Sequence, residues 1–409
     1  MNERPVYTLT STPAVLKSHD EALEVARSLK PRLRERAAEA EQLRRLPDAT
    51  VADILESGLY GIMKPKLFGG SELGSETMID VTVELASACA STGWVYMLWT
   101  AHMWMQALWP PDAQQEMWKN PNTLASSVVS TAGDLIRVDG GYTFTGRGFF
   151  SSGVDHCNWL TAAINLKTDD DSPPERRWLL IPREDFEIID DWHVVGLKGT
   201  GSKTIVLNDV FVPEARTLDT RDVDAGTAPG REINKHPMYG AIMNANFGSA
   251  MASPAVGAAK GFLELFEDKL RSKVNNTDRP DVKSSYVPGG FETTMARYAA
   301  AVAQVDAVHA LALQNARRYS CVPAGDVTPA ERAHYRMHSP FVAQQSRRAV
   351  NTLYEEGGGS GLLESSDLQR MWRDTNAAAA HHGLTWDHQA DAWPKTILGL
   401  STPPAGPLG

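Results

Sequence analysis

The sequence predicts an α+β protein in which helical segments at both ends flank a β domain in the middle. From about Asp20 to Trp118, apolar residues recur at the spacing of one helix face. Between Thr123 and Pro213 the spacing changes to the alternation typical of strands, and beyond Pro237 long helical patterns return. No helix-length pattern separates the strands, so a doubly wound parallel sheet is disfavoured.

Residues 1–122 are predicted to form an N-terminal helical domain. We expect Pro31 to interrupt its first helix before a charged helix over residues 33–43. A further helix opens at Asp48, directly after a proline. The apolar stretch Met78–Leu98 contains small residues that allow helices to approach closely, so this stretch is expected to be a helix pair at the centre of the fold.

Residues 123–216 are predicted to form the β domain. Leu135–Val138 and Tyr142–Thr145 flank the turn residues Asp139-Gly140-Gly141, a pattern that indicates a β-hairpin. We expect a compact antiparallel barrel or sandwich. Its further strands are predicted over residues 159–166, 178–181 and 204–212.

Residues 217–409 are predicted to form an antiparallel four-helix bundle. Short connections that contain Gly or Pro join four long helical patterns, as in bundles of antiparallel neighbours. The four patterns cover residues 243–271, 291–319, 329–354 and 366–393.

Composition excludes several classes of protein. The hydrophobic fraction of 42% supports a sizeable core. No apolar run reaches the length of about 18 residues that crosses a bilayer, and the N-terminus has no secretory signal, so a cytoplasmic protein is expected. A net charge of −10 without a basic stripe argues against nucleic-acid binding. Cys89, Cys157 and Cys321 lack CxxC spacing, no metal site is indicated, and buried thiols are expected.

Two segments could contact a flat ligand. Gly196–Ser202 is rich in glycine, but a strand rather than a helix follows it, so it does not match a dinucleotide-binding fingerprint. It is expected to form a turn that allows close backbone approach. Phe149–Gly153 combines aromatic rings with hydroxyls, which suits a planar heterocycle, although both phenylalanines could equally be core residues.

Histidines at two places are candidates for chemistry or for the core. His381 and His382 follow the run Ala377–Ala380 in a predicted helix, where an imidazole could accept a proton or simply be buried. His102 lies among aromatic residues and could line a pocket. The segment Gly357–Gly361 precedes a helix N-terminus that could hold a phosphate, although the glycines could equally serve only to turn the chain.

These motifs together resemble the acyl-CoA dehydrogenase fold over nearly the whole chain. The resemblance rests on the order of the three regions, on Phe149–Gly153, and on Gly199–Ser202 followed by Asp209–Pro213. Within that superfamily the chain resembles the two-component flavin-dependent monooxygenases, in particular the p-hydroxyphenylacetate 3-hydroxylase type of oxygenase. That likeness is carried by Ala40–Asp48, Ser151–His156, and Leu368–Asp374 followed by His381.

The resemblance implies an oxygenase that hydroxylates an aromatic substrate, phenolic or fused-ring, through a flavin 4a-hydroperoxide. A separate flavin reductase would supply reduced FMN, with FAD as the alternative, and O2 would be the co-substrate. It implies His381 as the base or the group that steers the phenolate, and Ser152 as a hydrogen-bond partner of the flavin ring. The implied flavin-binding residues are Phe150, Ser151, Ser152, Gly199, Thr200, Gly201, Ser202, Arg271, Lys273, Gly358 and Ser360. The implied substrate-binding residues are His102, Ser126, Ser127, Asn246 and His381.

The same resemblance implies a homotetramer in which residues 357–360 of a neighbouring subunit complete the flavin site. Two departures from the pattern suggest a wider, less acid-specific pocket. Met243–Phe247 replaces a segment that carries an arginine, and Gly383 replaces a tyrosine.

Two other functions stay open from the sequence. Glu355 or Glu356 could be the base of an acyl-CoA dehydrogenase, although the Thr-Glu-Pro-rich segment of those enzymes is replaced here by Ser126–Thr131. The chain could also be a flavin-binding homologue without catalysis.

Overall fold

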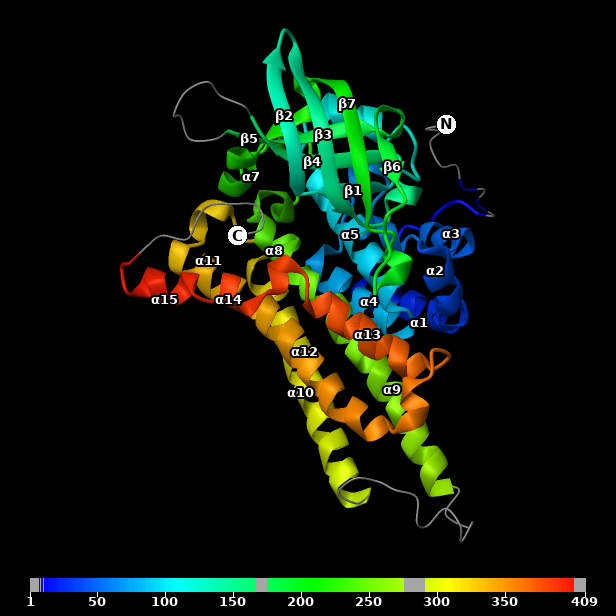
Figure 1. The fold of residues 1–409 in the computed structure, drawn as a ribbon. Coiled ribbons are helices and arrows are strands. Elements are labelled where there is room, and N and C mark those ends of the chain that lie inside the picture. The colour runs from blue at the N-terminus through cyan, green and yellow to red at the C-terminus, as the bar shows by residue number, and fades with distance from the viewer. Residues whose placement is uncertain (1–6, 8, 10, 167–174, 276–290, 401–409) are drawn as a thin grey trace.

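The computed structural model describes residues 7, 9, 11–166, 175–275 and 291–400 (Figure 1). Six α-helices lie before the β domain: α1 His19–Glu35, α2 Ala37–Leu43, α3 Asp48–Glu56, α4 Gly74–Ala88, α5 Ala90–Gln106 and α6 Pro111–Met117. The expected break at Pro31 is wrong, because α1 continues through it. Leu29 and Leu33 on either side of the proline are buried in the core, and this burial outweighs the single backbone hydrogen bond that proline removes.

Small residues bring three helices into close contact at the centre of the fold, as expected. A Cβ atom added to Gly93 of α5 would lie 2.4 Å from the Cβ of Ala86 on α4. A Cβ atom on Gly257 of α9 (Ser253–Asn275) would lie 2.5 Å from the same atom. Every residue of α5 is buried, so this helix lies wholly within the core.

The β domain consists of two four-stranded sheets, ordered β1-β4-β5-β8 and β2-β3-β7-β6. The predicted hairpin is present, because β2 and β3 pair antiparallel with Val138 opposite Gly141. Apolar side chains from both sheets fill the space between them. One pair departs from the expected antiparallel pattern, since β1 and β4 are parallel. The strands are β1 Ala125–Val128, β2 Ser130–Val138, β3 Gly141–Ser151, β4 Trp159–Asn165, β5 Arg176–Pro182, β6 Glu187–Ile189, β7 Lys203–Pro213 and β8 Thr217–Asp219.

The long helices of the C-terminal region, α9, α10 (Phe291–Tyr319), α12 (His338–Tyr354) and α13 (Asp367–Ala379), form the expected bundle. Short helices accompany them: α7 Thr220–Ala225, α8 Met243–Asn246, α11 Pro329–Arg336, α14 Trp386–Gln389 and α15 Ala392–Ile397. The continuous helix expected over residues 366–393 is wrong, because α13 ends at Ala379 and a turn follows.

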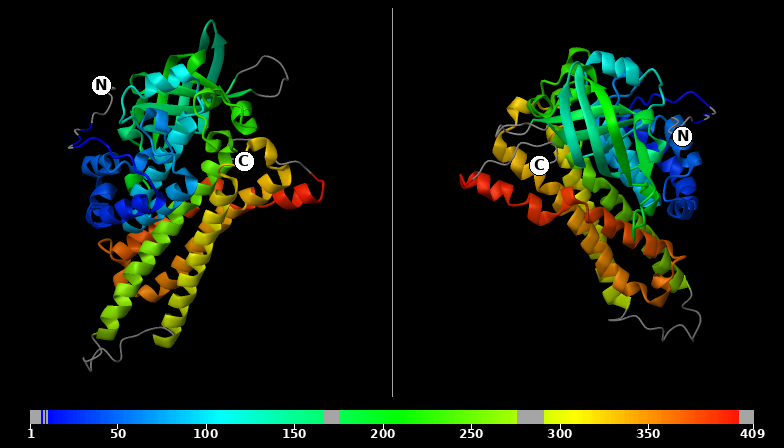
Figure 2. Two further views of the ribbon diagram at one scale, coloured as in Figure 1. Left: turned by 180° about the vertical axis from the view of Figure 1, so that it is seen from behind. Right: turned by 45° about the horizontal axis from the view of Figure 1, so that its top comes forward.

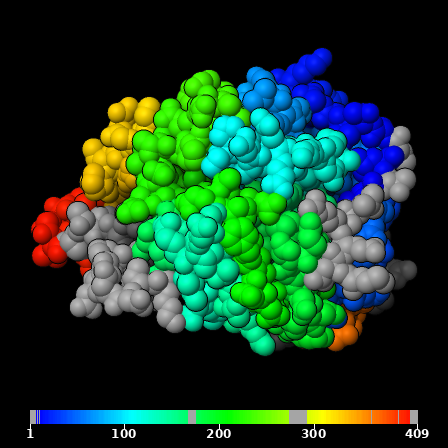
Figure 3. Space-filling view, turned by 90° about the horizontal axis from the view of Figure 1, so that it is seen from above, coloured from blue at the N-terminus to red at the C-terminus, as the bar shows by residue number. Residues whose placement is uncertain are grey.

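The β domain lies at one end of the molecule, and the bundle extends away from it (Figures 1 and 2). Seen from above the β domain, the N-terminal helices in blue and cyan lie along one side of the green strands (Figure 3). One apolar core continues from the N-terminal helices into the bundle. No helix in the described ranges is long and apolar enough to span a membrane.

Candidate active site

The buried indole of Trp94 on α5 brings together two residues that are far apart in the sequence. Its Nε1 donates a hydrogen bond to Ser152 Oγ, with 3.1 Å between the two atoms. Its ring centroid lies 5.5 Å from that of the His381 imidazole, beyond the end of α13. The two residues implied to be catalytic therefore contact the same indole.

Ser152 belongs to a chain of buried hydroxyls. Its Oγ lies 2.7 Å from Ser202 Oγ, which lies 2.7 Å from Thr200 Oγ1. The backbone N–H of Gly153 donates to the Thr200 carbonyl over 2.8 Å. The end of β3 and the glycine-rich loop before β7 thus form one polar surface, as their implied common role requires.

Phe150, next to Ser151 in β3, is exposed and does not belong to this chain of buried hydroxyls. Its φ of 64° lies in the left-handed region, which is rare for a bulky residue, and it occupies a β-bulge between Gly148 and Ser151. The bulge leaves Phe150 66% exposed, with its ring edge-to-face against Trp192 at 6.4 Å, while Ser151 next to it is buried. The alternative that Phe150 is an ordinary core residue is wrong.

His381 is not inside a helix, which corrects the expectation that His381 and His382 lie in one, because α13 ends at Ala379. Its backbone is extended, with φ −57° and ψ 138°, and the N–H of Gly383 donates to its Nδ1 over 3.1 Å. Burial, together with a smaller contribution from the neighbouring His382, lowers its pKa to about 4. The ring is therefore neutral near pH 7, and because Nδ1 accepts, its proton resides on Nε2.

The hydrogen-bond polarity of the His102 ring is opposite to that of His381, because its Nδ1 donates and its Nε2 accepts. Its Nδ1 lies 2.8 Å from the Ala125 carbonyl oxygen, which can only accept, so Nδ1 carries the proton. Nε2 is then free to accept from Ser127 Oγ, also at 2.8 Å. Burial lowers the pKa of His102 to about 4, although its hydrogen bond to Ala125 opposes this. His102 and Ser127 thus form a neutral pair in which Nε2 of the imidazole is the acceptor.

A serine pair connects these two halves of the site. Ser151 Oγ donates to Ser126 Oγ over 3.0 Å, so the end of β3 is joined to β1, which also carries Ser127. The structure therefore brings the implied substrate residues Ser126, Ser127 and His102 beside the implied flavin residues Ser151 and Ser152.

Asn246 is buried, but its amide binds backbone. Its Nδ2 donates to the carbonyls of Met238 at 3.2 Å and Ser320 at 3.1 Å. The ring of the next residue, Phe247, lies 5.6 Å from the His102 imidazole. Asn246 thus fixes the segment that presents Phe247 to His102, and its implied contact with substrate stays a prediction.

A second group of implied flavin residues lies elsewhere in the chain. Arg271 is exposed near the end of α9 that points away from the β domain, and it pairs with Glu267 (Figure 1). Lys269, also on α9, donates to the carbonyl of Gly357, next to Gly358. The side chains of Lys273 and Ser360 are not among those that the structure describes. Within one chain, Arg271 and Gly358 are not brought together with Ser152.

Glu356, one of the two candidate bases of the acyl-CoA dehydrogenase alternative, has a structural role here. Its buried carboxylate pairs with Arg297, and it accepts from Thr294 Oγ1 at 3.0 Å, both on α10. Glu355 is exposed. The thiols also differ from expectation, because Cys89 and Cys157 are buried but Cys321 is exposed.

Sequence reasoning missed Trp94 and Asp374. Asp374 is buried on α13, and its Oδ1 accepts from the backbone N–H of Leu197 at 2.6 Å. The small residues around Trp94 were a usable signal for close packing, but no local pattern shows that a single ring meets both Ser152 and His381.

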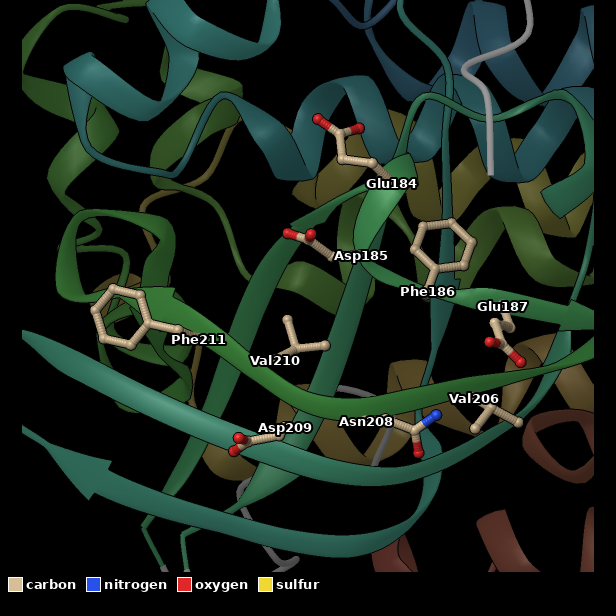
Figure 4. Close-up of a pocket in the computed structure, with 9 residues that line it drawn as sticks. All are labelled: Glu184, Asp185, Phe186, Glu187, Val206, Asn208, Asp209, Val210 and Phe211. Atoms are coloured by element: carbon tan, nitrogen blue, oxygen red, sulfur yellow. The ribbon is translucent and has the colours of Figure 1, made fainter. Parts of the chain in front are cut away.

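A hollow of about 420 Å³ on the outer face of the β domain is a separate feature (Figure 4). None of the implied site residues lines it. Its lining residues, mostly acidic or apolar, are Glu184, Asp185, Phe186, Glu187, Val206, Asn208, Asp209, Val210 and Phe211.

Comparison with known proteins defines the class. The family model of the acyl-CoA dehydrogenase N-terminal domain matches residues 19–122, and that of the C-terminal domain matches residues 249–386. The crystal structure of 3-HSA hydroxylase from Rhodococcus sp. RHA1 has a TM-score of 0.89 at 32% identity, over 95% of this chain and all of that one. XiaF from Streptomyces sp., in complex with FADH2 and glycerol, has a TM-score of 0.83 at 27% identity, over 94% and 96% of the two chains. The chain is an enzyme with the acyl-CoA dehydrogenase fold.

Relatives with known activities narrow the class. The chain is 33% identical to the oxygenase component of FADH(2)-dependent resorcinol hydroxylase from Rhizobium sp. (strain MTP-10005), over 95% of this chain and 96% of the relative. It is 29% identical to the oxygenase component of p-hydroxyphenylacetate 3-hydroxylase from Acinetobacter baumannii, over 98% and 94%. It belongs to the oxygenase components of two-component flavin-dependent monooxygenases, which confirms the predicted family.

Proposed function

We propose that this oxygenase hydroxylates a neutral phenolic or fused-ring aromatic substrate, with reduced FMN from a separate reductase. When bound, a reduced flavin would supply the two electrons that activate O2, so that one oxygen atom of O2 enters the ring and the other leaves as water. The chain of hydroxyls from Ser152 through Ser202 to Thr200 fits the edge of a flavin ring, because each hydroxyl can both donate and accept. The choice of FMN over FAD as the flavin is part of this proposal.

The observation that carries the proposal is the opposite polarity of the two imidazoles. A phenol becomes a strong nucleophile when it loses its proton, so an acceptor must lie at its hydroxyl. Ser127 can receive that proton and pass its own to His102 Nε2. His381, with its proton on Nε2, donates to the anion that forms and orients it. The base is thus assigned to the His102 side, and His381 takes the steering role.

A neutral substrate is favoured by what surrounds these groups. The described partners of His102 and His381 are carbonyl, hydroxyl, backbone amide and aromatic groups. A buried carboxylate would need a cation or several donors to offset its desolvation. The relative named for resorcinol acts on a substrate of the neutral kind.

Product analysis with a reductase, NADH, FMN and a panel of aromatics tests the proposal. The panel contains phenol, resorcinol, a naphthol and p-hydroxyphenylacetate, and products are identified by mass spectrometry. The proposal predicts hydroxylated products from the neutral members. Turnover of p-hydroxyphenylacetate alone would contradict the substrate class.

We also infer a homotetramer in which a neighbouring subunit supplies Arg271 and Gly358 to the flavin phosphate. The inference is supported by the separation of Arg271 from Ser152 within one chain. Mass photometry of the purified protein measures the assembly directly, and a monomer that binds FMN as tightly as the assembled protein would contradict it.

A further inference from the structure

Helix α13 holds the loop before β7 at three neighbouring points. Arg373 Nη1 donates to the carbonyl of Val195 at 2.6 Å, and Asp374 Oδ1 accepts from the N–H of Leu197 at 2.6 Å. Between them, the backbone of Gly196 lies so close that an added Cβ would be 2.6 Å from the Arg373 carbonyl oxygen. The helix therefore fixes the backbone path of this loop.

Leu197 needs such a partner because its own backbone is unfavourable. Its φ of 53° is left-handed, a conformation that is unfavourable for a residue with a Cβ. Its carbonyl accepts from Thr200 Oγ1 at 2.9 Å and from Trp192 Nε1 at 3.2 Å. The orientation of the Leu197 peptide thus sets the position of the Thr200 hydroxyl.

These contacts form a closed circuit through the site. Thr200 and Ser202 lead to Ser152, Ser152 accepts from Trp94, and Trp94 packs against His381. His381 lies just beyond the end of α13, the helix that carries Asp374. Helix α13 therefore meets the circuit at the loop, and the residues just beyond its end meet the circuit again at the imidazole.

We propose that Asp374 is a positioning residue that places the Thr200–Ser202–Ser152 hydroxyls for the flavin in register with His381. This proposal rests on the proposed function, because that function identifies the ligand of the hydroxyls as a flavin. The contacts of Asp374 themselves do not depend on it. Asp374 acts through the Leu197 N–H and is not expected to touch flavin or substrate.

An acceptor oxygen, rather than the negative charge, is what the geometry requires. Asp374 is 2% exposed, and burial raises its pKa to about 6, against the lowering effect of the Leu197 N–H. Both the neutral acid and the carboxylate keep an oxygen that can accept from Leu197. Asp374→Asn should therefore preserve the function, whereas Asp374→Leu removes the acceptor at similar volume.

Hydrogen exchange measured by mass spectrometry, together with FMN binding, tests the role of Asp374. In Asp374→Leu, peptides that contain Leu197 should exchange roughly tenfold faster, the effect of losing one buried hydrogen bond whose acceptor need not be charged. Reduced and oxidised FMN should bind at least several-fold more weakly, and exchange in α9 should not change. Asp374→Asn should match the wild type in both measurements. Asp367→Asn, on the same helix but paired with Arg370, is the matched control.

Gly196→Ala provides a second route if Asp374→Leu does not fold. Its methyl group pushes the loop from α13 while Asp374 stays intact, so the same faster exchange and weaker FMN binding are expected. Unchanged exchange at Leu197 in both variants would overturn the proposal, as would an Asp374→Asn protein that behaves like Asp374→Leu. A wild-type protein that hydroxylates no aromatic would refute the proposed function, but it would leave the exchange result to decide the role of Asp374.

Discussion

At the scale of single residues, the site depends on which nitrogen of each histidine carries the proton. The Ala125 carbonyl fixes the proton of His102 on Nδ1, and the Gly383 N–H leaves that of His381 on Nε2. Both rings are neutral near pH 7, because burial lowers each pKa to about 4. The two imidazoles are therefore an acceptor and a donor rather than two equivalent bases.

Replacement of Ser127 should separate these roles. Ser127→Ala removes the hydroxyl through which a phenol proton reaches His102 and should lower the turnover number by about a hundredfold, within the range for proton-transfer groups. FMN binding should not change. Turnover is measured with chemically reduced FMN, and Ser130→Ala on the exposed part of β2 is the control. A rate equal to that of the wild type would contradict the assigned proton path.

His381→Asn should be milder than His381→Leu. The asparagine amide can still donate a hydrogen bond, so we expect a loss of roughly tenfold against a hundredfold or more for leucine. The ratio of product to H2O2 reports the effect, with FMN titration as the check on binding. Equal losses in both variants would indicate that His381 acts as the base instead.

The buried histidine at position 102 should make the protein less stable in acid. Its folded pKa of about 4 lies below the ordinary value of 6.5, so the unfolded chain binds a proton more readily between these values. Stability should be complete above about pH 6.5 and fall by on the order of 3 kcal/mol as the pH drops through 4. Thermal unfolding of wild type and His102→Gln against pH measures this. A wild-type slope no steeper than that of the variant in that window would contradict it.

At the scale of elements, helix and strand periods identified most segments from the sequence, but turns set by distant contacts were missed. The strands near residues 135–145 and the helix of residues 291–319 follow directly from spacing. Contacts between residues far apart in the sequence, or between turn residues, set three features that spacing does not show. These are the turn at His381 with Gly383, the left-handed Leu197 with Asp374, and the bulge at Phe150. At Pro31 the sequence predicted a helix break that the structure does not have, because burial on both sides of the proline preserves the helix.

The close packing of α4 and α9 makes a separate prediction. Gly257→Ala adds a methyl group 2.5 Å from the Ala86 Cβ and 2.6 Å from the Val83 carbonyl oxygen, in a contact that cannot easily relax. Overpacking of this kind costs about 1–3 kcal/mol. Denaturant unfolding measures it, with Gly325→Ala as the control because nothing lies within 4 Å of its added Cβ. Equal stabilities of the two variants would be inconsistent with this packing.

At the scale of the whole molecule, the implied flavin residues fall into two groups in one chain. Ser152, Thr200 and Ser202 lie together beside the β domain, whereas Arg271 and Gly358 lie where α9 points away from it. The motifs predicted both groups, but nothing in the sequence shows their separation, because it arises from the length and direction of α9.

Arg271→Ala tests the proposed role of the distant group. If a neighbouring subunit's Arg271 holds the phosphate, FMN should bind about tenfold more weakly, while riboflavin, which lacks the phosphate, should bind as before. Glu267→Ala is the matched control, because it removes the same surface ion pair but keeps the cation. Thermal stability should hardly change in either variant, since exposed pairs contribute little. Equal weakening of FMN and riboflavin would argue against a phosphate contact.

The central claim, that the chain hydroxylates a neutral aromatic ring with reduced flavin and O2, is tested most directly by isotope incorporation. Chemically reduced FMN, the purified chain and resorcinol are mixed under isotopically labelled dioxygen, and the product is analysed by mass spectrometry. The account predicts one labelled oxygen atom in each hydroxylated product without any reductase in the mixture. Unlabelled product, or H2O2 with no hydroxylation of any phenol in the panel, would contradict it.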